Sequence, residues 1–264
     1  MKKLISILIL LLAFSACGEY QKALKNEDAA VKFEMATKLY DEGKYSKAIR
    51  LFEQIAPSFR GKPEAEKMYY MYAQAFYKTK QYYISAGRFE SFVASYPKSE
   101  KAEECSFLEA VSYSKSSPVY SLDQTETNKG IERMQAFIDE FPNSTYLEEA
   151  NGIAKVLREK LEKKSFEIAY EYYKISDHKS SVVALDNFIA DYPGTKYKEK
   201  ALFYKFDSAF IVAENSFVNK METRLTDAKL AYQALMKFNP NTTYKAKADD
   251  MLAQIEKDLK QFSK

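Results

Sequence analysis

One recurring motif constrains the fold of this chain more than any other feature. In its clearest copy, Leu185, Phe188, Ile189 and Tyr192 precede Pro193, at the spacing i, i+3, i+4 and i+7 of one stripe of an α-helix. The proline ends that helix because it has no N–H and pushes the preceding residue out of the α region. A Ser or Thr follows two residues later, where we expect it to cap the next helix. Each copy therefore predicts a helix, a stop and a restart.

The motif occurs five times. Its copies begin at positions 52, 89, 134, 185 and 232, which lie 37, 45, 51 and 47 residues apart. In the first copy, Arg60 stands where the others have proline. A unit of this length that buries one face on the next unit is typical of a helical repeat array.

The residues upstream of the first copy identify the kind of repeat. Ala36, Gly43, Tyr45 and Ala48 resemble the tetratricopeptide repeat, in which two helices approach through small residues, a glycine ends the first helix and an aromatic packs over the turn. Later units keep parts of this pattern: Ala73, Phe76, Tyr82 and Ser85; Ala110, Tyr113 and Gly130; Ala169, Tyr172, His178 and Ser181; Ala209 and Ala228. We therefore predict an all-α tetratricopeptide-repeat solenoid of five repeats, closed by a C-terminal capping helix from Tyr244 to Phe262.

Two irregular stretches suggest how the chain is divided. A loop-like segment, residues 116–124, interrupts the third unit, and residues 146–175 contain no proline and only one glycine, Gly152. We expect one long connecting helix over 146–175 that runs into repeat 4; two helices broken at Gly152 or near Lys163 are the alternative. The predicted parts are then 29–145 with repeats 1–3, the connecting helix 146–175, and 176–262 with the C-terminal repeats and the cap.

The N-terminus is typical of an exported lipoprotein. Lys2 and Lys3 precede an apolar stretch to Phe14, which suits a secretory signal and is shorter than a membrane-spanning helix. The residues 14–17, Phe-Ser-Ala-Cys, resemble a lipobox, in which the signal is cut before a cysteine that becomes lipidated. This predicts a signal peptide over 1–16, lipidation of Cys17 and a lipidated tether over 17–28. An ordinary signal peptide that contains a cysteine is the alternative.

Composition gives no support for catalysis or nucleic-acid binding. The formal net charge is +3 with 29% charged residues of both signs, which gives no general argument for nucleic-acid binding. His178 is the only histidine and stands in an aromatic turn position. Acidic pairs such as Glu103–Glu104 fall at expected helix starts, where they complement the helix dipole. We predict no catalytic residues, no metal and no cofactor, and therefore a protein that is not an enzyme.

The lipobox and the five repeats together resemble the BamD family, the tetratricopeptide-repeat lipoproteins of the outer-membrane β-barrel assembly machinery. The resemblance rests on residues 17–22 leading into the first repeat, on the insertion 117–124 and on Phe137 to Pro142, and the sequence near the lipid is similar to that of Bacteroidetes members. It implies a non-catalytic scaffold that is lipid-anchored in the outer membrane and faces the periplasm. It also implies two partners: unfolded outer-membrane β-barrel proteins at the N-terminal repeats and a BamA-like barrel insertase at the C-terminal repeats.

In such a repeat protein, the first helix of each unit lines a groove. In the first two units we expect the substrate-peptide groove to be lined by Phe33, Thr37, Tyr40, Tyr70, Gln74, Tyr77 and Lys78. The aromatic residues offer large contact areas with polar tips, and Lys78 is placed to meet a C-terminal carboxylate. Packing between repeats is the alternative for Tyr40 and Tyr77.

Two other functions fit an anchored repeat protein. One is a different periplasm-facing envelope adaptor; adaptors of this kind usually carry a coiled coil before the repeats, and only residues 18–28 are available here. The other is a surface glycan-binding module, whose sites are usually lined by tryptophan, and this chain has no Trp.

Overall fold

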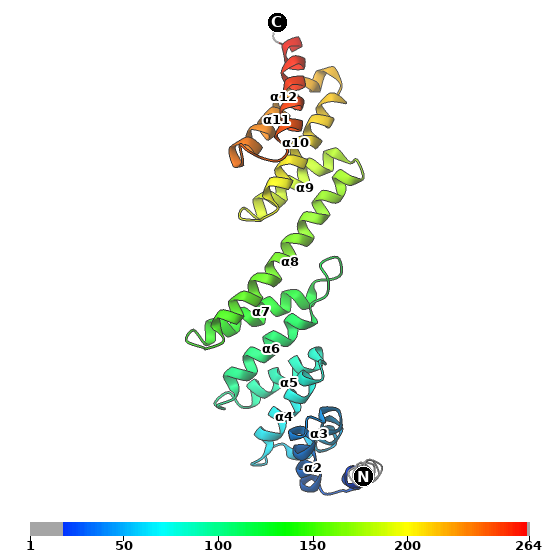
Figure 1. Cartoon of the computed structure of the whole chain (residues 1–264), viewed down its shortest axis with the longest axis vertical. Helices are drawn as coiled ribbons and strands as arrows, with labels where there is room; N and C mark the ends of the chain where they lie inside the picture. The colour runs from blue at the N-terminus through cyan, green and yellow to red at the C-terminus, as the bar shows by residue number, and fades with distance from the viewer. Residues whose placement is uncertain (1–17, 263–264) are drawn as a thin grey trace, which may run out of the picture. The chain divides into compact units, whose positions relative to one another are not determined.

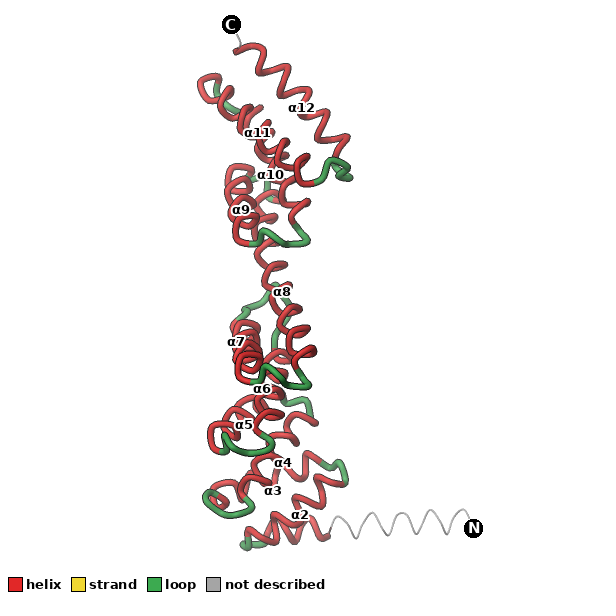
Figure 2. The backbone as a smooth tube through the Cα atoms, turned by 90° about the vertical axis from the view of Figure 1, so that its left-hand side faces the viewer, coloured by secondary structure: helices red, strands yellow, loops and turns green. Residues whose placement is uncertain are grey.

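The computed structural model describes residues 18–262, which are α-helical apart from short connections, with no strand among them (Figure 2). Cys17 and the signal segment lie outside the described residues. The chain divides into two compact units, and the boundary falls between Leu157 and Arg158. The three loop residues Val119–Ser121 belong to the second unit.

The first unit is built from consecutive helix pairs (Figure 1). After a helical stretch at residues 18–25, its helices are α2 (Ala29–Asp41), α3 (Tyr45–Phe59), α4 (Ala65–Lys78), α5 (Tyr82–Ser95), α6 (Ala102–Ser116), α7 (Thr125–Glu140) and the first part of α8 (Leu147–Lys174). The second unit holds the rest of α8, α9 (His178–Asp191), α10 (Lys198–Glu214), α11 (Val218–Phe238), α12 (Lys245–Leu259) and a final 3₁₀ turn (Lys260–Phe262).

The recurring motif forms the second helix of each pair. Its five copies lie on α3, α5, α7, α9 and α11, and the residues Phe52, Phe89, Met134 and Leu185 at corresponding positions are fully buried. Four of these helices end two residues before the motif proline, as its missing N–H requires. The predicted all-α tetratricopeptide-repeat fold is therefore confirmed.

The Ser or Thr after each proline has a different role from the one predicted. Ser99, Ser144 and Thr242 do not occupy the N-cap position; each accepts a hydrogen bond from the backbone N–H two residues on, which belongs to the N-cap residue. Each hydroxyl also donates to a glutamate in the first turn of the preceding unit's first helix: Ser99 to Glu66, Ser144 to Glu103 and Thr242 to Glu199. The residue therefore ties consecutive repeats together instead of capping one helix.

Left-handed backbone closes three of the turns inside repeats. Gly43 has φ +73°, and Lys80 and Ser176 take the same conformation at the equivalent turns, with φ +61° and +62°. Glycine adopts this region without strain, whereas other residues pay a cost that the surrounding packing must offset. This explains how the second and fourth units close their turns without glycine.

Tyr172 of the fourth unit is not buried as its counterparts three residues after the corresponding alanines are, namely Leu39, Phe76 and Tyr113. Tyr172 is 38% exposed, and Tyr173 packs instead on His178 with ring centroids 5.8 Å apart. The four-residue offset from Ala169 to Tyr173 is the same as from Ala36 to Tyr40, so the helical register selects Tyr173.

Helix α8 runs without a break through Gly152 and the two lysines after Glu162. Its N-terminal part places Ala150 and Ala154 in a core with α6 and α7, and its C-terminal part places Phe166 and Ala169 in a core with α9. One helix thus contributes to the hydrophobic cores of both units.

A candidate peptide-binding pocket in the first unit

A pocket of 530 Å³ lies between α2, α4 and the start of α6. Its lining residues come from the first helices of repeats 1 to 3 and the turn before α4: Thr37, Tyr40, Asp41, Pro63, Glu66, Lys67, Tyr70, Met71 and Lys101. The sequence predicted a groove lined by the first helix of each repeat, and this pocket lies on those helices. The pocket therefore includes three of the seven residues expected from the sequence.

Tyr70 is held at the pocket wall by a polar network. Its hydroxyl donates to Glu104 Oε1 at 2.8 Å, and Gln74 Nε2 donates to the same oxygen at 3.1 Å. Lys101 Nζ donates to Glu104 Oε2 at 3.1 Å, so the carboxylate of Glu104 has a partner at each oxygen. The network fixes the Tyr70 ring, which also lies edge to face with Phe92 at 6.1 Å.

Tyr40 offers a polar group that the protein itself does not use. Its ring meets Tyr45 edge to face, and its hydroxyl makes no hydrogen bond with another described residue. Partial burial raises the pKa of Tyr40 to about 12, and burial together with Glu104 raises the pKa of Tyr70 well above its usual value. Both phenols are therefore protonated at neutral pH. Tyr40 can donate a hydrogen bond to a ligand.

Thr37 lines the pocket without offering its hydroxyl to a ligand. Its Oγ1 is buried and has no hydrogen-bond partner within residues 18–262. The buried atom is out of reach of a ligand in the pocket, so Thr37 contributes to the lining through the rest of its side chain. The pocket thus combines aromatic surface with the Tyr40 hydroxyl, which lacks a partner, and this suits an extended peptide.

The structure places the other four predicted groove residues elsewhere. Gln74 lies behind the wall, 5% exposed, and serves the Tyr70 network. Phe33 packs on Phe59 at 5.0 Å in the α2–α3 core, and Tyr77 packs between Tyr82 and Phe89. Lys78 is exposed at the end of α4 and does not line the pocket.

Sequence analysis missed the contribution of the third repeat. Lys101 and Glu104 stand at the start of α6, and the sequence reading assigned the acidic pair there only a dipole role. The usable signal was the repeat itself, because the first helix of the third unit is next to that of the second. Extending the groove by one repeat would have included both residues.

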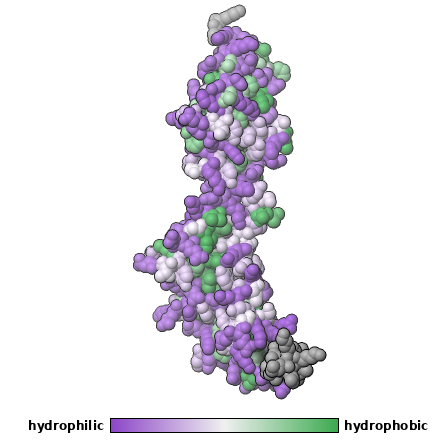
Figure 3. Space-filling view, in the orientation of Figure 1, coloured by the Kyte–Doolittle hydropathy of each residue, from purple (hydrophilic) through white to green (hydrophobic). Residues whose placement is uncertain are grey.

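The second unit presents its own surface features. Buried Asp207 accepts from Tyr173 at 2.8 Å and from Lys247 Nζ at 2.7 Å, which joins α10 to α8 and α12. The turn between α10 and α11 exposes Phe217 at 85% and Val218 at 73%. The face seen in Figure 3 is mostly hydrophilic with several small apolar patches.

The described residues contain neither a candidate metal site nor a helix suited to spanning a membrane. No group of His, Cys, Asp or Glu within 18–262 has the arrangement of a metal site. Among the same residues, no helix combines the length and the apolar character that crossing a bilayer requires.

Fold and pocket together define an α-helical tetratricopeptide-repeat protein with an open pocket on the first helices of its repeats. Comparison with known proteins shows the family: residues 25–170 and 158–262 match the model of YfiO, described as outer membrane lipoprotein, and the chain belongs to this family. The predicted resemblance to the BamD family is confirmed.

Two curated relatives carry the BamD name. The chain is 21% identical over 192 residues to the outer membrane protein assembly factor BamD of Caulobacter vibrioides, covering 73% of this chain and 61% of the relative. It is 30% identical over 133 residues to a provisionally assigned BamD of Aquifex aeolicus, covering 47% of this chain and 42% of the relative. The chain thus spans less than two thirds of the length of either relative.

Proposed function

We propose that this protein is a non-catalytic scaffold of outer-membrane β-barrel protein assembly, anchored by lipid at Cys17 and facing the periplasm. The family and the assembly-factor names of its relatives support a role in outer-membrane protein assembly and a location at the outer membrane. In this proposal the N-terminal repeats bind unfolded barrel proteins, and the C-terminal repeats bind a BamA-like barrel insertase.

One observation carries the substrate part of the proposal. Tyr40 and Tyr70 line the same pocket with protonated phenols, and Tyr40 has no hydrogen-bond partner in the described structure. An unfolded barrel strand carries apolar side chains at alternate positions, and its backbone N–H and C=O groups need hydrogen-bond partners. Aromatic rings with polar tips satisfy both requirements.

The test is titration of the protein with labelled peptides that carry the last strand of an outer-membrane barrel. Tyr40→Ala removes a partly buried ring and its hydroxyl, and we expect binding about thirtyfold weaker, as for a central aromatic anchor worth roughly 2 kcal/mol. Tyr83→Ala is the matched control, because Tyr83 is 69% exposed on α5 and does not line this pocket. Equal affinity of the two variants would contradict the groove assignment.

Co-purification of the barrel insertase tests the division of labour. Tyr40→Ala should leave capture of the insertase unchanged, since the proposed site lies in the second unit. If the variant keeps its fold and loses both activities, one site serves both partners. Identification of proteins crosslinked from each unit separates the assembly role from that of another envelope adaptor or a glycan-binding module.

A further inference from the structure

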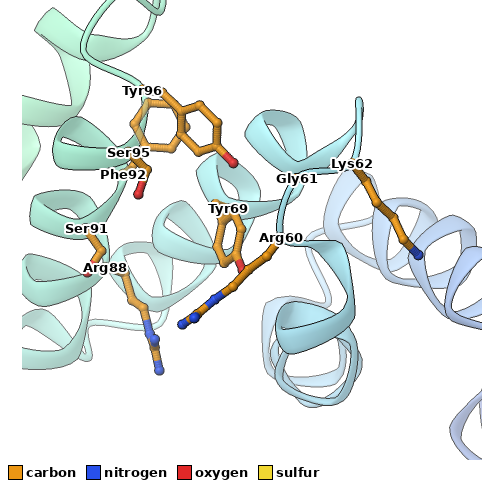
Figure 4. A pocket seen from close by; sticks show the side chains of 9 residues that line it. All are labelled: Arg60, Gly61, Lys62, Tyr69, Arg88, Ser91, Phe92, Ser95 and Tyr96. Atoms are coloured by element: carbon orange, nitrogen blue, oxygen red, sulfur yellow. The ribbon is translucent and has the colours of Figure 1, made fainter.

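A second pocket in the first unit has a different chemistry. It measures 640 Å³ and lies where the end of α3, helix α4 and the end of α5 meet (Figure 4). Three cationic residues and three aromatic residues dominate its lining: Arg60, Lys62, Arg88, Tyr69, Phe92 and Tyr96. It shares no lining residue with the pocket of Tyr40 and Tyr70.

The cations of this pocket are not neutralised by the protein. None of the lining residues is acidic, and neither Arg60 nor Arg88 forms an ion pair with a described residue. Figure 4 shows the two arginine side chains reaching toward the same region beside Tyr69. Arg88 is held there by stacking on the Tyr72 ring, with its guanidinium 4.9 Å from the ring centroid. Two like charges directed to one place favour an anion between them.

The remaining wall is aromatic and fixed. Tyr69 donates its hydroxyl to the carbonyl of Ala56 at 2.6 Å, which holds its ring in place. The Tyr96 ring lies 6.5 Å from the Tyr69 ring and 5.2 Å from the Phe92 ring. An apolar side chain next to the anion would find a preformed contact surface there.

The position of the pocket selects a singly charged anion. Arg60 is the C-cap of α3 and Tyr96 is the C-cap of α5, so two helix C-termini meet at this pocket. Helix C-termini carry about half a negative charge each, so the two together offset about one of the two arginine charges, while the Lys62 side chain points away from both arginines (Figure 4). A carboxylate suits this balance better than a doubly charged phosphate, and a guanidinium binds a carboxylate through two parallel hydrogen bonds.

We propose that this pocket binds an acidic peptide segment of a partner protein. A carboxylate of the segment lies between Arg60 and Arg88, and a neighbouring apolar side chain packs on Tyr69 and Tyr96. The site is separate from the peptide pocket of the proposed function and does not depend on it.

The experiment measures fluorescence anisotropy of a labelled hexapeptide of alternating Asp and Phe, titrated with the full-length protein in detergent. Arg60→Gln and Arg88→Gln should each weaken binding about tenfold, as expected for loss of a charge-assisted hydrogen bond. Arg50→Gln is the matched control, because Arg50 is an exposed arginine of α3 outside the pocket. Arg88→Lys keeps the positive charge but replaces the planar guanidinium. Weakened peptide binding in this variant would show that the guanidinium is needed as well as the charge. Melting temperatures verify that each variant folds.

Four results would overturn the proposal. One is equal binding of the Asp peptide and a matched Asn peptide; another is equal affinity of Arg60→Gln and Arg50→Gln. The third is that binding of inorganic phosphate or of anionic phospholipid vesicles depends on Arg60, whereas binding of the peptide does not. Tyr40→Ala should leave the affinity for this peptide unchanged. The fourth result is loss of peptide binding in Tyr40→Ala, which would place the peptide in the first pocket. Failure of this site leaves the barrel-peptide titration unaffected, so the two proposals are tested separately.

Discussion

Tyr40 and Tyr45 meet edge to face across the turn between α2 and α3, with ring centroids 5.3 Å apart and planes at 72°. The same relationship recurs at the same five-residue offset between Tyr77 and Tyr82, at 5.7 Å and 67°, and between Tyr173 and His178, at 5.8 Å and 70°. Each pair closes the turn of one repeat. The first pair also fixes the ring that lines the candidate peptide pocket.

His178 is the exception within this series. Its ring takes the position of a tyrosine, but its Nδ1 is buried with no hydrogen-bond partner in the described structure. His178→Tyr should raise the free energy of unfolding by about 0.5–1 kcal/mol, because it restores the larger ring and removes the unpaired nitrogen. Urea denaturation followed by circular dichroism measures the change. An unchanged or lower stability would show that the turn does not accept the phenol.

Two glycines should respond in opposite ways to alanine. A Cβ at Gly130 would lie 3.1 Å from Leu157 Cδ1 and 3.3 Å from the Ser114 backbone nitrogen, whereas a Cβ at Gly152 meets nothing within 4 Å. We expect Gly130→Ala to cost about 1 kcal/mol through overpacking, and Gly152→Ala to gain roughly 0.5–1 kcal/mol through helix propensity. Thermal unfolding of both variants, compared with the parent protein, gives the two signs. The same sign for both would contradict the close approach at Gly130.

Stability should depend on pH through Glu109 of α6. Burial raises the pKa of this carboxyl to about 7, against the opposing effect of Arg133. Arg133 Nε lies 3.2 Å from Glu109 Oε1, but the two atoms are not aligned for a hydrogen bond. The folded state therefore binds this proton more tightly than the unfolded state. Its contribution to stability is fully present below a pH of about 4.5 and is lost as the pH rises to about 7.

Glu109→Gln should remove that pH dependence. The loss in the parent protein is at most about 3 kcal/mol for a shift of this size, and the nearby Arg133–Glu90 ion pair remains in the variant. Glu140→Gln, at an exposed position at the end of α7, is the control and should keep the parent's profile. Urea titrations between pH 4 and 8 compare the three proteins. Parallel profiles for the parent and Glu109→Gln would show that this carboxyl is not the source.

Helix α12 should be needed for the stability of the second unit. Ile255 is fully buried and Met251 nearly so, in the core formed with α10 and α11. Ile255→Ala should cost about 2–4 kcal/mol, whereas Lys257→Ala at an exposed position should change stability by less than about 0.5 kcal/mol. A chain that ends at Asn241 should melt at a lower temperature than the full chain. Equal melting temperatures would contradict the capping role.

Cys17 should carry the lipid. It is the only cysteine that follows a signal-type apolar segment, and the other cysteine, Cys105, is fully buried in the first unit. Burial raises the pKa of the Cys105 thiol to about 12, which leaves it unreactive. Cells grown with labelled fatty acid should label the parent protein and not Cys17→Ala. Label retained by Cys17→Ala in the membrane fraction would refute the assignment.

The sequence by itself determined the repeat, the helix ends and the family. Apolar residues at helical spacing followed by proline specify local structure, since a missing N–H and a restricted φ act within a few residues of the chain. For the same reason, the positions of Phe89, Met134 and Leu185 in the cores followed from their spacing alone.

Only the tertiary structure decided which groove residues share a pocket and what the polar residues do. Tyr40 and Tyr70 are 30 positions apart, and Glu104 is 34 positions beyond Tyr70, so their contact depends on how three repeats stack. Tyr77 follows the same pattern as Tyr40 and pairs with Tyr82 as Tyr40 does with Tyr45, yet it also packs on Phe89 and does not line the pocket. Likewise, the tie from Ser144 to Glu103 spans 41 residues. Helical periodicity sets which face a side chain is on, but the neighbour it meets there is set by the packing of one repeat on the next.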